Sequence, residues 1–249
     1  MDDRILLVPF GLTPDPRTYE TWASPRILLT MLKGFLPVDI FRWPHLKSEK
    51  PIGYGWEAMA EAFRAQIRPE HHIVDVGTGN PILLQAAATT GARSLITVGF
   101  LETVPTLEAR GDTAMANVMR LQYDLSEAGA AQIIPLLMQG ADEDYLAAAI
   151  REVNESIDQT RKNQSPRVSE TQGSPIEAGI LEIPSLFLDP PLYLDGTFEL
   201  FKHYAPAARR DTLKEWGTRV HEEDGGRELA NKVIPFIEEV IVARANAQT

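Results

Sequence analysis

The sequence contains no cysteine, which excludes both disulfide bonds and thiolate metal sites. It also lacks any run of about 18 apolar residues, so we do not expect a membrane span. The first residues, Met1-Asp2-Asp3-Arg4, do not have the basic and then apolar segments of a secretion signal. A reducing cytoplasm is compatible with these absences, and we expect a cytoplasmic location.

Positive charge is scarce, because 24 Lys and Arg residues stand against 35 Asp and Glu residues, which gives a net charge of −11. Such a surface repels phosphate backbones, so we do not expect nucleic acid as a partner. A small neutral or apolar molecule is the expected ligand, and a homodimer is compatible with the sequence. The chain is rich in hydrophobic residues, which make up 44% of its 249 residues and suffice for a large core.

Short β-prone apolar runs alternate with segments of helical periodicity. The predicted strands are 5–10, 38–42, 73–76, 95–98, 184–188 and 213–216. The predicted helices between and after them are 25–36, 56–67, 81–90, 198–204 and 225–243. This alternation predicts an α/β fold with a mostly parallel sheet of about six strands flanked by helices.

The alternation stops between about Pro105 and Lys162, where the sequence shows helical periodicity but no convincing strand. Helices are expected around 115–123, 133–137 and 145–153, and the segment 163–174 is polar. Extra core packing explains most of the apolar residues in this stretch. The layout also favours an inserted helical lid, 104–180, between the two parts of an α/β core, 1–103 and 181–249.

The most informative segment is the glycine-rich turn Asp75-Val76-Gly77-Thr78-Gly79 between a predicted strand and a predicted helix. Backbone N–H groups in such a turn can face a ligand. The turn resembles the loop of class I S-adenosylmethionine-dependent methyltransferases. That family, however, usually has a further glycine where Pro81 stands and an acidic residue where Gly99 stands, and its loop follows the first strand of the fold.

The same segment also resembles the nucleophile elbow of the α/β-hydrolases, G-x-S-x-G. In that alignment Asp75 takes the place of the first glycine, Gly77 takes the place of the serine, and Gly79 matches the last glycine. The strand ending Pro9-Phe10-Gly11, the strand Ile183-Pro184-Ser185-Leu186 and the C-terminal region 216–236 are similar to that family in order and spacing. We therefore prefer the α/β-hydrolase resemblance, with the usual first two antiparallel strands absent.

The resemblance implies that the catalytic triad has been lost. Gly77 stands where the serine is expected, Leu192 where the acid is expected, and Thr218 or Arg219 where the histidine is expected. His221 lies close enough in sequence to serve as a base, although a surface histidine is the simpler interpretation. We therefore expect no hydrolysis through a covalent intermediate.

The resemblance also implies a ligand cavity between core and lid. Its expected lining is Phe10, Gly11, Leu12, Gly77, Thr78, Phe100, Leu101 and Leu192. The N–H groups of Leu12 and Thr78 would polarise a carbonyl, and the candidate acid–base residues are Asp75, Arg219 and His221. We expect no cofactor and no metal site.

These features lead to one preferred function and two alternatives. The preferred hypothesis is an enzyme without a nucleophile that catalyses cyclisation, isomerisation or dehydration of a small molecule in secondary, polyketide-type metabolism. The alternatives are a non-catalytic small-molecule binding protein and an S-adenosylmethionine-dependent methyltransferase.

Overall fold

The computed structural model describes residues 2–9, 18–44, 46, 56–77, 80–100, 103–124, 126–158, 179–191, 197–217 and 219–247. The described strands form one sheet in the order β2-β1-β3-β4-β5-β6, and every pairing between neighbours is parallel. Their bounds are β1 Arg4–Val8, β2 Val38–Ile40, β3 His71–Asp75, β4 Ser94–Val98, β5 Ser185–Asp189 and β6 Arg209–Thr212. The predicted parallel sheet of about six strands is confirmed.

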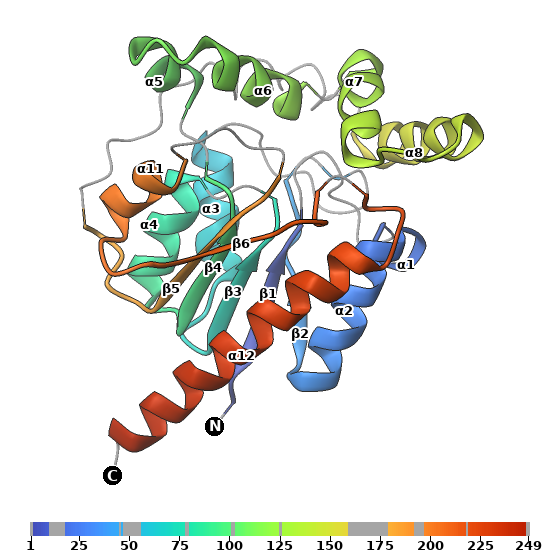
Figure 1. The fold of residues 1–249 in the computed structure, drawn as a ribbon. Coiled ribbons are helices and arrows are strands. Elements are labelled where there is room, and N and C mark those ends of the chain that lie inside the picture. The colour runs from blue at the N-terminus through green and yellow to red at the C-terminus, as the bar shows by residue number, and fades with distance from the viewer. Residues whose placement is uncertain are drawn as a thin grey trace.

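Helices cover both faces of the sheet (Figure 1). One face is covered by helices that share a core with Ile5, Leu7 and Val74 of the strands. These helices are α1 Thr18–Thr21, α2 Ala23–Phe35 and α12 Asp224–Ala247. The other face packs Leu6 and Ile73 against the remaining core helices, which are α3 Trp56–Gln66, α4 Pro81–Thr90 and α11 Thr197–Tyr204. Alternate strand residues therefore supply two separate hydrophobic cores, as expected for a sheet buried on both sides.

The predicted position of the last strand is wrong. The expected strand was Leu213–Trp216, but β6 is the polar segment Arg209–Thr212, which pairs with β5 alone. An edge strand has a neighbouring strand on one side only, so polar and charged residues are tolerated there. Leu213 and Trp216 are buried, but in the connection to α12 rather than in the sheet. Their burial accounts for the apolar pattern that suggested a strand.

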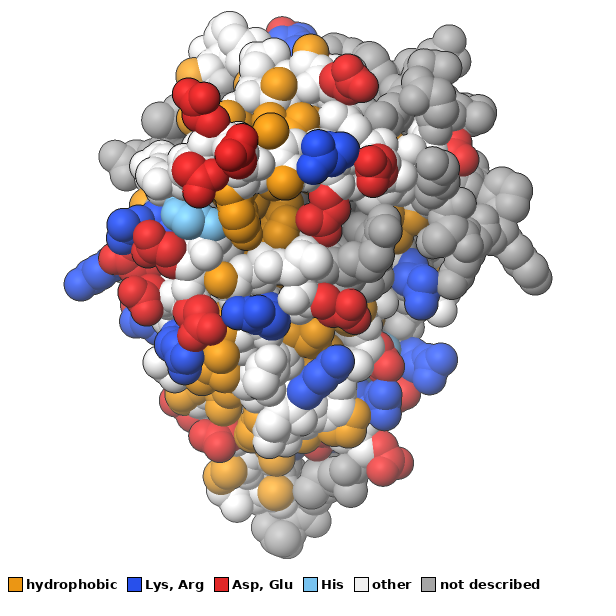
Figure 2. All heavy atoms as spheres, turned by 90° about the vertical axis from the view of Figure 1, so that its right-hand side faces the viewer, with side chains coloured by type: hydrophobic (Ala, Val, Ile, Leu, Met, Phe, Trp, Pro, Cys, Tyr) orange, Lys and Arg blue, Asp and Glu red, His pale blue; other side chains and the backbone are white. Residues whose placement is uncertain are grey.

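Among the described residues, four further helices lie between β4 and β5 in the chain, at the carboxyl-terminal edge of the sheet (Figure 1). They are α5 Val104–Ala109, α6 Thr113–Tyr123, α7 Glu127–Leu137 and α8 Glu143–Ser156. The three helices expected in this stretch are present, and α5 adds a fourth. Figure 2 faces the side of α7 and α8 and shows acidic side chains gathered around exposed hydrophobic ones in its upper part. This upper part of the face is unfavourable for polyanions.

Candidate functional site

The glycine-rich turn lies at the centre of the sheet, because β3 runs between β1 and β4. Val76 and Gly77 are buried and leave the carboxyl end of β3. Asn80 caps α4, and its Oδ1 accepts a hydrogen bond from the N–H of Leu83 at 3.0 Å. Pro81 opens the helix, where its missing N–H costs nothing. Gly77 therefore occupies the predicted strand–turn–helix position, but after the third strand of the chain, unlike the methyltransferase arrangement.

Asp75 is the one ionisable residue of this turn, and its side chain is almost completely buried, with 1% exposed. Its Oδ1 accepts a hydrogen bond from the N–H of Gly77 at 3.0 Å. Its Oδ2 lies 3.2 Å from the Oγ1 of Thr97, the residue paired with Asp75 across β3 and β4. The register of the two strands thus places a hydroxyl beside the carboxyl group.

The Thr97 hydroxyl has two neighbours but only one proton to donate. Its Oγ1 is 2.9 Å from the backbone oxygen of Gly99, which can only accept, and 3.2 Å from Asp75 Oδ2. When Thr97 donates to Gly99, the Asp75 carboxyl can complete the second hydrogen bond only by donating its own proton. The geometry therefore favours the neutral, protonated form of Asp75.

Burial acts in the same direction. It raises the pKa of Asp75 from its ordinary value of 3.8 to about 7, against the lowering effects of the Gly77 N–H and the Thr97 hydroxyl. A carboxyl group with a pKa near neutrality has both protonation states populated at physiological pH. Such a group can donate and accept a proton in turn, which is the property required of a general acid–base residue.

Tyr19 of α1 is a second polar residue in this region, and no sequence pattern identifies it as a site residue. Its side chain is 3% exposed, and burial, followed by the negative charge of Asp75, raises the pKa of its hydroxyl. Tyr19 thus remains a protonated hydrogen-bond donor near neutrality. Nothing in the sequence links a tyrosine of a four-residue helix to a strand end some fifty positions later. Only the fold shows this proximity.

Arg219 and His221, the other two predicted catalytic residues, do not have the same neighbours as Asp75. The Arg219 guanidinium is half exposed and forms ion pairs with Glu222 at 3.1 Å and Glu215 at 4.0 Å. The Nε2 of His221 lies 3.7 Å from Glu222, and the imidazole ring lies against Tyr145 of α8, with ring centroids 6.1 Å apart. No hydrogen bond or ion pair joins either residue to Asp75. The structure therefore does not connect the three predicted acid–base residues into one hydrogen-bonded group.

The segment containing Arg219 and His221 instead contacts both helix α7 and the start of α2. The N–H of Val220 donates to the backbone oxygen of Leu137, and the N–H of Ser24 donates to the backbone oxygen of Val220. Close by, Glu152 of α8 accepts hydrogen bonds from Trp22 Nε1 at 3.3 Å and Thr21 Oγ1 at 3.1 Å. Helices α7 and α8 thereby dock on the start of α2 and on the segment before α12.

The expected ligand-lining residues fall into two groups. Phe100 is fully buried and packs against Phe201 and Tyr204, with ring centroids 5.7 and 5.6 Å away. Gly77 is buried at the turn described above. The remaining predicted residues lie outside the described residues: Phe10, Gly11, Leu12, Thr78, Leu101 and Leu192, together with Thr218 from the histidine position.

Within the described part of the chain, no group of three or more His, Asp and Glu side chains is arranged to hold a metal ion. None of the described helices combines the length and the apolar character needed to cross a membrane.

Comparison with known proteins yields matches only at the level of structure. No protein-family model matches the sequence, and no curated protein matches it. Among solved structures, bromoperoxidase from Bacillus anthracis is similar with a TM-score of 0.66 and 10% identity, over 96% of this chain and 92% of that one. A hydrolase from Oleispira antarctica is similar with a TM-score of 0.63 and 15% identity, over 96% and 92%. An esterase from Exiguobacterium antarcticum is similar with a TM-score of 0.65 and 10% identity, over 95% and 92%.

Proposed function

We propose that this chain, which has the α/β-hydrolase fold, transfers a proton on a small carbonyl-containing ligand, with Asp75 as the acid–base residue. The observation that carries this proposal is the buried carboxyl of Asp75, whose pKa is raised to about 7 beside the Gly77 turn. Perturbed carboxyl groups of this kind are typical of catalytic acids and bases. The carboxyl end of a central parallel strand is also where α/β folds bind ligands.

The residue types at the triad positions support a mechanism without a covalent nucleophile. Gly77 stands at the serine position and has no side chain. Leu192 stands at the acid position, and neither Thr218 nor Arg219 at the histidine position can act as a base at neutral pH. Three independent replacements with residues unsuited to these roles favour loss of covalent hydrolysis over a single misaligned position.

The proposed chemistry needs only one proton carrier. Ionised Asp75 takes a proton from the carbon next to the ligand carbonyl, and the electron pair moves onto the carbonyl oxygen. The N–H groups of Leu12 and Thr78 would stabilise this oxygen. Asp75 then returns the proton, either to another carbon, which isomerises the ligand, or to a β-hydroxyl group, which leaves as water. Ring closure onto a second carbonyl would follow from the same carbanion.

Helices α5 to α8 would act as a lid that excludes water from the ligand, with the docking contacts of α8 holding it closed. The ligand would be a small apolar polyketide-type compound, held between lid and core without a cofactor. The protein would work in the cytoplasm.

Hydrogen–deuterium exchange tests this proposal without knowledge of the natural substrate. Cyclic ketones and 1,3-dicarbonyl compounds are incubated with the protein in D₂O, and deuterium at the carbon next to the carbonyl is measured by mass spectrometry. We expect exchange that is faster than in buffer, that rises as pH increases through about 7, and that Asp75→Asn reduces at least a hundredfold.

The Asp211→Asn variant is the matched control, because this carboxylate lies on the edge strand β6 and pairs with Lys232 at 2.7 Å. It should exchange deuterium like the wild type. Tight binding of a compound without exchange at any pH would overturn the proposal in favour of a binding protein. An exchange rate that is equal in wild type and Asp75→Asn would also reject it.

Hydrolysis is the second candidate, because the similar solved structures include proteins named as a hydrolase and an esterase. Ionised Asp75 would then activate a water molecule for attack on an ester. Activated esters distinguish the two candidates: hydrolysis that Asp75→Asn abolishes and serine-directed reagents do not affect would support this second reaction. Hydrolysis blocked by a serine-directed reagent would instead show that the nucleophile position has been misassigned.

A further inference from the structure

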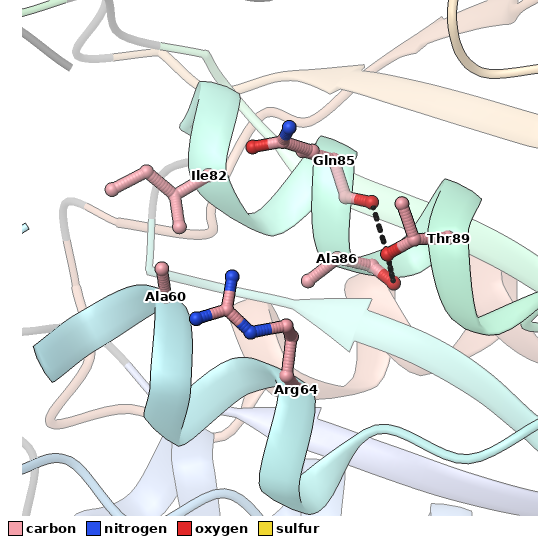
Figure 3. Close-up of a pocket in the computed structure, with 6 residues that line it drawn as sticks. All are labelled: Ala60, Arg64, Ile82, Gln85, Ala86 and Thr89. Carbon is pink, nitrogen blue, oxygen red and sulfur yellow. Dashed lines mark hydrogen bonds between the residues drawn. The ribbon is translucent and has the colours of Figure 1, made fainter. Parts of the chain in front are cut away.

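A separate cleft lies between α3 and α4, on the outer side of the sheet layer (Figure 3). Its volume is about 140 Å³. The residues that line it are Ala60, Arg64, Ile82, Gln85, Ala86 and Thr89. It shares no residue with the Asp75 site, so the two can be tested independently.

The cleft has an apolar floor and two polar groups above it. Ala60, Ile82 and Ala86 supply the apolar surface. In Figure 3 the guanidinium of Arg64 reaches from α3 toward α4, and the side chain of Gln85 extends over the same space from α4. The Thr89 hydroxyl is already engaged, because it donates to backbone oxygens of its own helix. Arg64 and Gln85 therefore remain as the donors available to a ligand.

Among the described residues, no carboxylate forms an ion pair with Arg64, the one charged residue that lines the cleft. The chain carries a net charge of −11, and many of its arginines are ion-paired, among them Arg4, Arg209 and Arg210. Glu61 stands three residues before Arg64 on α3, at a spacing that favours pairing on a helix, yet no ion pair forms between them. The guanidinium instead faces the cleft (Figure 3). The guanidinium is always charged and presents parallel N–H donors above an apolar surface, an arrangement that suits a planar anion.

We infer that this cleft binds a small aromatic monocarboxylate. A cavity of roughly 150 Å³ lined by apolar side chains holds one benzene ring, so the volume matches a single aromatic ring. The carboxylate of such a ligand would accept two parallel hydrogen bonds from Arg64, and the Gln85 amide would supply a third. The ring would lie on Ala60, Ile82 and Ala86.

Titration calorimetry with benzoate tests this inference on the whole chain. We expect saturable binding to the wild type with a dissociation constant near or below the millimolar range. Arg64→Gln should weaken it about tenfold or more, because a charged hydrogen-bonding partner is lost. Benzyl alcohol, which has the ring but no charge, should bind at least tenfold more weakly than benzoate. Ala60→Leu should abolish binding by filling the cleft while Arg64 stays in place.

Arg151→Gln is the matched control, because Arg151 is also exposed and forms no ion pair with any described residue, but it lies on α8 and lines no part of the cleft. It should bind benzoate like the wild type, and circular dichroism would establish that each variant is folded. Absence of saturable heat with the wild type would overturn the inference. Equal affinity of wild type and Arg64→Gln would do the same, because benzoate would then be bound elsewhere.

Discussion

When a carboxyl group is buried with no cation beside it, the hydrogen-bond donors around it determine whether it keeps its proton. Among the described residues, Asp75 has one hydrogen-bond donor, the Gly77 N–H, and one neighbouring hydroxyl, that of Thr97, which can donate to the Gly99 carbonyl instead. The ionised form therefore lacks the two or three donors that usually compensate a buried carboxylate. A raised pKa follows from this shortage.

The shifted pKa makes stability depend on pH. In the unfolded chain Asp75 ionises near 3.8, whereas in the folded protein it ionises near 7. The folded state thus holds the proton more tightly, so this residue's stabilising contribution is complete below pH 3.8 and is lost as the pH rises to about 7. The loss is on the order of 4 kcal/mol, at 1.36 kcal/mol per pKa unit.

Asp75→Asn should remove this dependence. The asparagine can accept from Gly77 through its oxygen and donate to Thr97 through its NH₂ group, as the protonated acid does. We expect similar free energies of unfolding for both proteins near pH 4, and a variant more stable than the wild type by about 2–4 kcal/mol at pH 8. Urea titrations at both pH values measure the difference. Parallel pH profiles would contradict a neutral Asp75.

At the scale of the element, sequence patterns located most strands and helices but could not assign partners. The predicted helix 81–90 coincides with α4, whose start is marked by the Asn80 cap and Pro81. The polar edge strand β6 was missed because it depends on pairing with β5, which leaves no hydrophobic pattern. The same limit applies to the site. Asp75 could be identified from its position before the glycines, but Thr97 becomes its neighbour only through the register of β3 and β4.

Helices α2 and α12 pack so closely that one position of their contact requires a glycine. They form the most extensive helix–helix contact among the described elements. A Cβ atom at Gly226 would lie 2.1 Å from the backbone oxygen of Ser24 and 2.5 Å from a methyl group of Ile27. The backbone of α12 can therefore approach α2 only where it has no side chain, and the Gly226 N–H donates to Ser24 Oγ at 3.1 Å at this point.

We expect Gly226→Ala to reduce the free energy of unfolding by about 1–3 kcal/mol, because the methyl group would push the two helices apart. Gly34→Ala is the control within the same helix pair, since a Cβ there would have no neighbour within 4 Å. That change should stabilise the protein by about 0.5–1 kcal/mol through helix propensity. Thermal unfolding of both variants gives the comparison, and a Gly226→Ala protein as stable as the wild type would rule out a close crossing.

At the scale of the whole molecule, the Asp3 carboxylate connects the N-terminal segment with the C-terminal helix. Asp3 is buried, and its Oδ1 accepts a hydrogen bond from Arg244 of α12 at 2.9 Å. Arg93 lies 3.4 Å away and His72 of β3 3.6 Å away. Burial is the main cause that lowers the pKa of His72, which is neutral at physiological pH. The two arginines are then the charged partners of Asp3.

Asp3→Asn should destabilise the fold by about 2 kcal/mol. Removing one member of a fully buried pair costs about 3–5 kcal/mol, and the partly exposed side chains of Arg244 and Arg93 reduce this loss because water can solvate them. Asp2→Asn, at an exposed neighbouring position, should have an effect below about 0.5 kcal/mol. Urea unfolding at pH 7 measures both, and equal midpoints for the two variants would disprove the role of Asp3.

The Asp3–Arg244 contact lies at the amino-terminal edge of the sheet, whereas Asp75 lies at the carboxyl-terminal edge of the same strands. The first and last described segments of the chain are therefore neighbours, on the side of the sheet away from Gly77 (Figure 1). A short peptide could join them and the chain could be reopened in a surface loop, so the molecule is suited to circular permutation. Reporter domains fused to either end would project away from Gly77 and Asp75.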